Sequence, residues 1–403
     1  MQIKKILIIT EAITKPLYIP RIRNIYHHLQ EKNIEIDWVA EKYEEIPDSF
    51  NLKLHQIPFY KHKGKIGKIE WIIKNILNLI FDYKNKYFSK KISDFSRNKH
   101  YDLVLCSTCH TFGLKAAYNV AKTHNIPLYI DLRDIAEQCT ANEYSNSKLA
   151  LGFLGKLYRN ININRRNKIL KLANNITTVS PWHVDFIKQF NPNTHLIYNG
   201  YDINLFQPQN IKTKYFDIIY TGKWYSSSLQ DPTLLFEALA QINNPKIRLV
   251  IYTDSNKHPE IKNLAEQYNI TTPLILNNYI ANNEIPQKLN ESSIVLVLTR
   301  KENKGIMTTK FFEALGVEKP ILCVRSDEGC LAQVIKETQS GLAATNVEEV
   351  KNFINQHYQQ WEGQGYTHIN IKDKEKFTRQ NQALQFEQIF NQHNNALNTN
   401  TNI

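Results

Sequence analysis

Short apolar runs alternate with amphipathic stretches along most of the chain. The first half holds five runs of strand length, at residues 6–9, 36–39, 103–106, 128–130 and 176–179. A second series follows at residues 217–220, 247–252, 274–276, 294–298 and 321–324. Apolar runs of this length, separated by helical patterns, are typical of parallel strands that helices cover on both faces. The pattern therefore predicts an α/β fold with two doubly wound sheets, one from each series.

Loop-forming residues separate the two series. Asn199-Gly200 and Pro208 lie between them and are typical of a linker. The chain has 403 residues, whereas a single hydrophobic core stops growing at roughly 250–300 residues. We therefore predict a first domain over residues 1–200 and a second over residues 205–370.

The end of the chain is polar. After the second series, a helix is expected at about residues 371–392, where it would pack back on the first domain. The tail at 393–403 is rich in Asn and poor in apolar residues, so we expect it to be disordered.

A helix that can bind phosphate is expected between the last two strands of the second series. It should begin at Thr308 or Thr309, soon after the apolar run 294–298. The amino end of such a helix lies at the carboxyl edge of a parallel sheet, where free N–H groups and the helix dipole attract anions. The sequence therefore predicts a phosphate site at this edge.

Two charged residues follow on the same helix. Lys310 adds a positive charge within the first turn, and Glu313 lies three positions further, on the same face. A carboxylate there could accept hydrogen bonds from ribose hydroxyls. The alternative interpretation is an ordinary surface ion pair between Lys310 and Glu313, which stabilises a helix only slightly.

Three segments, in this order, resemble the retaining glycosyltransferases of family 4, which have the GT-B fold. They are Ile197-Tyr198-Asn199-Gly200-Tyr201-Asp202, Ile219-Tyr220-Thr221-Gly222-Lys223 and the stretch 305–316 with Lys319-Pro320 behind it. The resemblance covers most of the chain. It implies two Rossmann-like domains facing a cleft. The implied reaction moves a sugar from a nucleoside-diphosphate sugar to a glycolipid, a lipid-linked oligosaccharide or a polysaccharide precursor, with retention of configuration.

The resemblance implies that the second domain binds the donor. The implied donor-binding residues are Gly222, Lys223, Tyr279, Ile280, Gly305, Thr308, Thr309, Lys310 and Glu313. Glu313 would hold the ribose, while Lys223 and Lys310 would act as catalytic groups by stabilising the charge that the departing diphosphate gains. The sequence has no Asp-x-Asp triplet, so we expect these positive charges to replace a metal ion, and we expect no cofactor.

Two departures from the family pattern leave alternatives open. Gly305 occupies the position of the first glutamate in the commonest pattern, and Tyr225 to Ser228 replace a usual second lysine. The donor sugar therefore cannot be carried over. An epimerase of the same fold, or a catalytically silent protein that binds sugar nucleotides, remains an alternative to a transferase.

Polar residues at two strand ends of the first domain are candidates for the acceptor side. His110 follows the run 103–106, and Asp131, Arg133 and Asp134 follow the run 128–130. We predict catalytic roles for His110 and Asp131, and contacts with the acceptor for Arg133 and Asp134. Ordinary salt bridges at the edge of the core are the alternative interpretation.

Positive charge is concentrated in one part of the first domain. The net charge is +12, and from Lys61 to His100 eleven Lys or Arg face three acidic residues. The apolar residues Ile69, Ile72, Ile73, Ile76 and Ile80 fall on one helical face within this stretch. We predict that the stretch between Lys61 and Lys99 contacts an anionic membrane surface. A core-packed helix with a basic rim is the alternative interpretation.

Other partners and locations are disfavoured. The sequence contains no nucleic-acid-binding module. It has no apolar stretch of membrane-spanning length and no signal peptide at its start, so we expect a cytoplasmic protein at the inner face of the plasma membrane.

Overall fold

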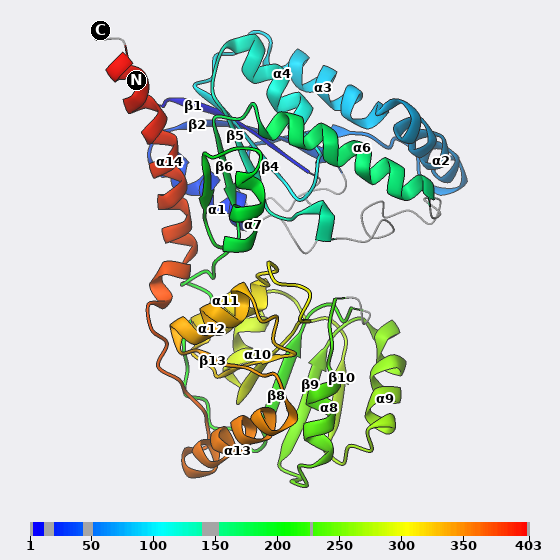
Figure 1. The fold of residues 1–403 in the computed structure, drawn as a ribbon, viewed down its shortest axis with the longest axis vertical. Coiled ribbons are helices and arrows are strands. Elements are labelled where there is room, and N and C mark those ends of the chain that lie inside the picture. Colours follow the sequence, from blue (N-terminus) through cyan, green and yellow to red (C-terminus); the bar gives the residue numbers. More distant parts are fainter. Residues whose placement is uncertain (1–2, 12–19, 43–50, 139–152, 226–228, 401–403) are drawn as a thin grey trace. The chain divides into compact units, whose positions relative to one another are not determined.

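The chain forms two compact units, which the computed structural model describes over residues 3–11, 20–42, 51–138, 153–225 and 229–400 (Figure 1). Unit 1 comprises Met1–Tyr198 and Gln382–Ile403. Unit 2 comprises Asn199–Asn381. The chain therefore leaves unit 1 just before Asn199-Gly200 and returns to it within the last helix.

Unit 1 contains a seven-stranded parallel sheet in the order β3-β2-β1-β4-β5-β6-β7. Its strands are β1 (Lys5–Thr10), β2 (Glu35–Lys42), β3 (Leu54–Pro58), β4 (Leu103–Thr108), β5 (Leu128–Leu132), β6 (Asn175–Thr178) and β7 (Thr194–Leu196). Its helices are α1 (Pro20–Glu31), α2 (Gly64–Phe81), α3 (Tyr83–Ser96), α4 (Leu114–His124), the short 3₁₀ helix η2 (Ala136–Gln138), α6 (Phe153–Leu170), α7 (Pro181–Lys188) and α14 (Arg379–Asn400).

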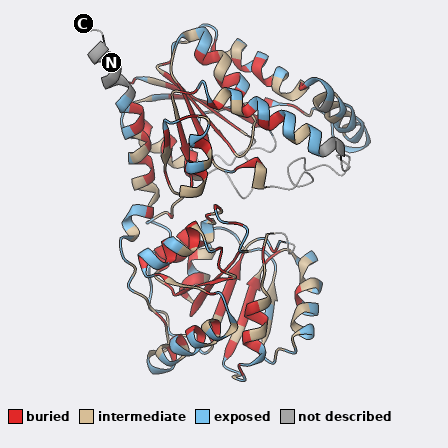
Figure 2. Cartoon of the chain, in the orientation of Figure 1, coloured by how far each residue is buried: buried red, intermediate tan, exposed pale blue. Residues whose placement is uncertain are grey.

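Alternate residues of each central strand enter two separate cores of unit 1. Ile6 and Ile8 of β1 pack with α1 and with Phe386 and Phe390 of α14. Leu7 and Ile9 belong to the core that α3, α4 and α6 cover. This period-two pattern gives the sheet two apolar faces, which explains the continuous apolar runs of its strands. Figure 2 shows the strands buried on both faces.

Unit 2 contains a six-stranded parallel sheet in the order β10-β9-β8-β11-β12-β13. Its strands are β8 (Phe216–Thr221), β9 (Ile247–Tyr252), β10 (Leu274–Asn277), β11 (Ile294–Leu298), β12 (Ile321–Val324) and β13 (Gly341–Ala343). Its helices are α8 (Thr233–Ala240), η3 (Ser255–Lys257), α9 (His258–Gln267), α10 (Ile285–Asn290), α11 (Thr309–Val317), α12 (Cys330–Thr338), α13 (Val347–Gln364) and η4 (Lys374–Phe377).

The predicted fold class of two doubly wound parallel sheets is confirmed, and each of the ten predicted strands is present. The structure adds three strands that the sequence pattern did not predict: β3, β7 and β13. All three lie at the edges of their sheets. An edge strand is covered less completely, so it needs no continuous apolar run and leaves a weak signal in the sequence.

The end of the chain differs from the prediction in two respects. The last helix begins at Arg379 rather than near residue 371, because η4 occupies Lys374–Phe377. The segment 393–403, predicted to be a disordered tail, is helical as far as Asn400, and residues 401–403 lie outside the described residues. Once a helix has formed, each added residue gains a backbone hydrogen bond, so the polar sequence can extend it.

Within the part of the chain that the structure describes, every helix is too short or too polar to cross a membrane.

Candidate functional site

Two loops of unit 2 meet at Gly222 and Lys310. Gly222 follows β8, and Lys310 lies in the first turn of α11, which begins at Thr309 as predicted. A Cβ atom built on Gly222 would lie 2.5 Å from Lys310 Cε and 2.7 Å from Lys310 Nζ. The φ of Gly222 is +123°, which side-chain-bearing residues rarely adopt. The structure therefore brings together two residues that are 88 positions apart and that the sequence predicted for the same ligand.

The two charges on α11 are partly withdrawn from water. Burial lowers the pKa of Lys310, and the Glu313 carboxylate opposes this shift. Burial raises the pKa of Glu313, and the positive charges of Lys310 and Arg379 oppose this rise. Lys310 Nζ also lies 5.4 Å from the centroid of the Tyr220 ring. An anion bound beside Lys310 would favour the charged ammonium further and so oppose the effect of burial.

A hydrogen-bond network clamps the loop that carries Lys223. The Tyr220 hydroxyl donates to the Lys223 carbonyl oxygen at 2.6 Å, and Gln230 Nε2 donates to the Tyr220 hydroxyl at 2.9 Å. Gln230 Oε1 in turn accepts from the Tyr225 backbone N–H at 2.9 Å. The Lys223 side chain is exposed, with its ammonium 4.8 Å from the Tyr225 ring. The backbone of Lys223 is thus fixed while its charge stays accessible to a ligand.

The predicted base-binding residues lie beside this loop. Thr253 Oγ1 accepts from the Trp224 backbone N–H at 3.1 Å, and the Thr253 side chain also hydrogen-bonds with Tyr279. Tyr279 is 53% exposed just beyond β10. Burial still raises its pKa, whereas the Thr253 hydrogen bond lowers it. Thr253 therefore links the loop of Lys223 to the loop of Tyr279 and Ile280.

The remaining donor-side residues lie between β11 and α11. Gly305 is buried, and the neighbouring Asn303 side chain donates to the Leu229 carbonyl oxygen at 2.9 Å. Thr308 is the N-cap of α11 in extended backbone conformation, but its hydroxyl makes no capping hydrogen bond. By contrast, the Ser180 side chain caps α7 by accepting from His183 N. The Thr308 hydroxyl is therefore not committed to the helix end.

In unit 1, Asp131 lies inside the sheet rather than on its surface. Its carboxylate accepts hydrogen bonds from Arg21 at 3.0 and 3.1 Å, from Ser107 at 2.8 Å and from Thr177 at 2.8 Å. Arg21 also donates to the carbonyl oxygens of Ile197 and Tyr198, both at 2.9 Å. These contacts favour a positioning role for Asp131. Through Arg21, it holds the backbone of Ile197 and Tyr198 near β5.

A second polar cluster lies at the carboxyl edge of the same sheet. The Glu11 carboxylate, just after β1, accepts from the Thr108 hydroxyl at 2.7 Å, from the Cys109 N–H at 2.9 Å and from Arg133 Nη2 at 3.0 Å. Burial raises the pKa of Glu11, but Arg133 and these hydrogen bonds hold it below its usual value. His110 is close enough to contribute to the same effect. The structure thus brings His110 and Arg133 together, with Asp134 exposed next to them.

Sequence reasoning missed several residues of these networks, among them Glu11, Tyr220 and Gln230. Glu11 directly follows a predicted strand, and that position at the carboxyl edge could have indicated it. Tyr220 and Gln230 act through side-chain hydrogen bonds across a loop, and no spacing in the sequence indicates such contacts.

Comparisons with known proteins bear on unit 2 first. Residues 202–368 match the family model described as Glycosyl transferases group 1. The matched segment contains every predicted donor-side residue, from Gly222 to Glu313. A comparison of the sequence with the curated proteins finds no match.

Solved structures resemble the whole chain. Sucrose-phosphate synthase (tll1590) from Thermosynechococcus elongatus aligns with a TM-score of 0.68 and 15% identity, over 98% of this chain and 100% of that chain. Anabaena Alr3699/HepE, in complex with UDP and glucose, aligns with a TM-score of 0.66 and 14% identity, over 96% and 100%. The lipopolysaccharide outer core galactosyltransferase WaaB aligns with a TM-score of 0.58 and 14% identity, over 95% and 99%.

The chain has the GT-B fold, and its segment 202–368 matches the group 1 glycosyltransferases.

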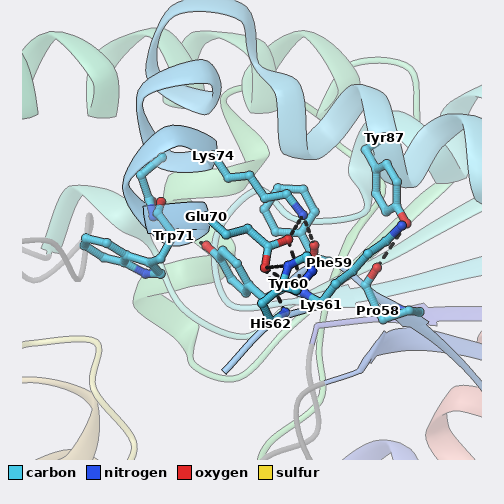
Figure 3. A network of polar contacts seen from close by, with 10 residues as sticks. Pro58, Phe59, Tyr60, Lys61, His62, Glu70, Trp71, Lys74 and Tyr87 are labelled. Atoms are coloured by element: carbon cyan, nitrogen blue, oxygen red, sulfur yellow. Dashed lines mark hydrogen bonds and ion pairs between the residues drawn. The ribbon is translucent and has the colours of Figure 1, made fainter. Parts of the chain in front are cut away.

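Unit 1 contains a helix, α2, that turns its polar side toward the protein (Figure 3). The Glu70 carboxylate accepts from the backbone N–H groups of Lys61 at 3.0 Å and His62 at 2.9 Å, and from Lys74 Nζ at 2.7 Å. Lys74 also donates to the Phe59 carbonyl oxygen and lies 4.8 Å from the Phe59 ring centroid. The Lys74 ammonium and the backbone donors lower the pKa of Glu70 to about 2.

The apolar side of α2 faces outward. We call this face the α2 stripe; its members are Ile66, Ile69, Ile72, Ile73, Ile76 and Ile80, which are 43–65% exposed. The alternative in which this helical face packs into the core is therefore wrong. A helix that is docked through a carboxylate and an ammonium, with its isoleucines in water, leaves apolar surface unburied.

The lysines around α2 differ in their contacts. Lys74 is engaged by Glu70, and Lys84 forms an ion pair with Glu41 at 2.7 Å, so these two lysines serve unit 1 itself. The exposed basic side chains in and around α2 and on α3 include Lys61, Lys63, Lys65, Lys68, Lys86, Lys90 and Lys91.

Proposed function

We propose that this protein is a glycosyltransferase that binds a nucleoside-diphosphate sugar in unit 2 and transfers the sugar to a glycolipid, a lipid-linked oligosaccharide or a cell-surface polysaccharide precursor, with retention. The observation that carries the proposal is the close approach of Lys310 to Gly222, inside the segment that matches the group 1 family. Backbone without a side chain beside an ammonium is the arrangement that a diphosphate requires. The complex of Anabaena HepE with UDP-glucose supports the same ligand class.

Each donor-side residue has a distinct role in this proposal. Glu313 holds the ribose, and Tyr279 and Ile280 contact the base. Lys310, Thr308 and Thr309 contact the diphosphate at the start of α11. Lys223, whose backbone is clamped but whose ammonium is exposed, stabilises the negative charge that grows as the glycosidic bond breaks. Gly305 leaves the sugar without the carboxylate of the commonest family pattern.

The positive charges also replace a metal ion in this proposal. We expect turnover to be unchanged by a chelator such as EDTA, because Lys223, Lys310 and the amino end of α11 stabilise the diphosphate. Loss of turnover on chelation, with recovery on addition of magnesium or manganese, would show that this assignment of charge is wrong.

On the acceptor side, we propose that His110, Arg133 and Asp134 contact the acceptor. His110 lies close to the Glu11–Arg133 pair at the carboxyl edge of the sheet. Asp131 supports this edge of the sheet through Ser107 and Arg21, without contacting the substrate itself.

We also propose that the enzyme works on the cytoplasmic face of the plasma membrane. The exposed α2 stripe, with lysines on its flanks, is suited to lie in the interfacial layer of an anionic bilayer. A lipid-linked acceptor would then be presented at the same surface.

Product analysis tests the proposed reaction. Labelled nucleoside-diphosphate sugars are incubated with the enzyme, with and without a lipid-linked acceptor, and products are identified by NMR. Transfer that depends on acceptor and keeps the donor's anomeric configuration supports the proposal. Interconversion of free sugar nucleotides would identify an epimerase, and binding without either reaction would identify a silent partner; both results contradict it.

A further inference from the structure

A groove of about 490 Å³ lies on the outer surface of unit 1. It is formed by the end of α2, the start of α3, the first half of α4 and the second half of α6, all of which lie close together in Figure 1. Asn78 of α2 donates to the Tyr158 hydroxyl of α6 at 2.7 Å, so α2 and α6 are held side by side. The volume of the groove is within the range of small-molecule sites.

One part of the groove lining is apolar. It includes Ile80 and Phe81 of α2, Leu114 of α4, Ile169 of α6 and Leu172 just beyond it. Ile80, Phe81 and Leu172 are 61%, 55% and 56% exposed. Because Ile80 is also a member of the α2 stripe, the groove continues this apolar surface without a break.

The other part of the lining is strongly basic. Lys86, Lys115, Arg165 and Lys168 are exposed around the groove. The lining contains one acidic residue, Asp82, which forms an ion pair with Arg165 at 3.2 Å. Among the described residues, no carboxylate forms an ion pair with Lys86, Lys115 or Lys168. Three unpaired ammonium groups thus surround a partly apolar groove.

We propose that this groove binds the anionic head group of a membrane lipid, with the lipid chains lying along the α2 stripe. The lysines neutralise the phosphate, and Phe81 and Leu172 contact the glycerol end of the chains. The two halves of the groove match the two halves of such a molecule, whereas a soluble anion would leave the apolar lining unused. The site rests on the proposed membrane contact, but it does not require that sugar transfer occurs.

Vesicle sedimentation with matched charge reversals tests the site. The groove variant is Lys115→Glu with Lys168→Glu. The control variant is Lys122→Glu with Lys171→Glu, which changes the net charge equally at exposed positions on α4 and just after α6, outside the groove lining. Each protein is mixed with phosphatidylcholine vesicles that contain or lack phosphatidylglycerol, at constant ionic strength.

The wild-type protein should bind only the vesicles that contain phosphatidylglycerol. The groove variant should lose about tenfold or more in apparent affinity, and the control variant only about twofold. Equal losses of affinity in the two variants would show a diffuse electrostatic contact and overturn the proposed groove site. Absence of wild-type binding, or binding equal for neutral vesicles, would also overturn it.

Two further arms identify the ligand and separate this proposal from sugar transfer. Inorganic phosphate, exchanged for chloride at equal ionic strength, should leave vesicle binding unchanged. Competition by phosphate would identify a site for free phosphate and overturn the proposal that the groove binds a lipid. Thermal stabilisation by nucleoside diphosphates should be the same in the groove variant as in the wild type. Failure of that stabilisation in both proteins would contradict the proposed donor site while leaving the vesicle result intact.

Discussion

Gly222 leaves space beside Lys310 that alanine would fill. The new Cβ atom would lie 2.5 Å from Lys310 Cε, and the backbone would be strained at a φ of +123°. We expect Gly222→Ala to displace the ammonium and lower kcat/KM for the donor about tenfold or more, because catalysis depends on ångström-scale placement of charge. Steady-state kinetics with varied donor measure this loss.

Gly363→Ala is the matched control. This glycine lies in α13, and a Cβ atom there would meet nothing within 4 Å. The control should keep wild-type kinetics and stabilise the helix by about 0.5–1 kcal/mol. Wild-type kinetics in Gly222→Ala would show that the diphosphate does not bind between this glycine and Lys310.

Lys223 and Glu313 should affect different kinetic constants. In the proposed role, Glu313 holds the ribose equally in ground and transition states, so Glu313→Gln should mainly raise KM for the donor. We propose that Lys223 meets the negative charge that grows as the diphosphate departs, so Lys223→Ala should lower kcat as well. Losses of about 2–5 kcal/mol, or roughly thirty- to several-thousand-fold, are typical of such contacts.

The control for this pair is Lys262→Ala, an exposed lysine on α9. It should leave both constants unchanged. If both Lys223→Ala and Glu313→Gln also had wild-type kinetics, the nucleotide would have to bind elsewhere.

At the scale of elements, α2 depends on the charge of one carboxylate. The folded-state pKa of Glu70 is about 2, below its ordinary value of 4.5. Its contribution to stability is therefore present above about pH 4.5 and is lost as the pH falls toward about 2. We expect Glu70→Gln to increase hydrogen exchange in Gly64–Phe81 at neutral pH.

The difference in exchange between Glu70→Gln and wild type, corrected for intrinsic rates, should narrow as the pH falls from about 4.5 toward 2. Glu31→Gln, at an exposed position of α1, is the control and should exchange like the wild type. A difference that stays constant over this pH range would mean that the Glu70 charge does not hold the helix.

The orientation of α2 also shows a limit of pattern-based prediction. The spacing of Ile69, Ile73, Ile76 and Ile80 correctly indicated one apolar helical face. Periodicity cannot tell, however, whether such a face meets the core or the solvent. The Glu70 contacts with the Lys61 and His62 backbone decide that question, and they involve main-chain atoms that carry no sequence signal.

At the scale of the molecule, the two sheets were predictable because their central strands are buried on both faces. Strands such as β1 and β11 must be continuously apolar, whereas β7 at an edge need not be. The candidate site was predicted at Gly222 through the family resemblance and at α11 through the expected helix start, and the roles of both stay predictions. It was not predictable where side chains meet across loops, as with Gln230 and Tyr220, because folding alone brings them together.

Nucleotide binding by the purified enzyme tests the central claim, which is that unit 2 holds a nucleoside-diphosphate sugar beside Gly222 and Lys310. Thermal unfolding is measured with a panel of nucleoside diphosphates and their sugars, for the wild type, Gly222→Ala and Gly363→Ala. A ligand at a hundred times its Kd should add about 2.7 kcal/mol to the free energy of unfolding. We predict this stabilisation for at least one ligand in the wild type and in Gly363→Ala, and a clearly smaller effect in Gly222→Ala. Stabilisation of all three proteins to the same extent, or of none, would contradict the account.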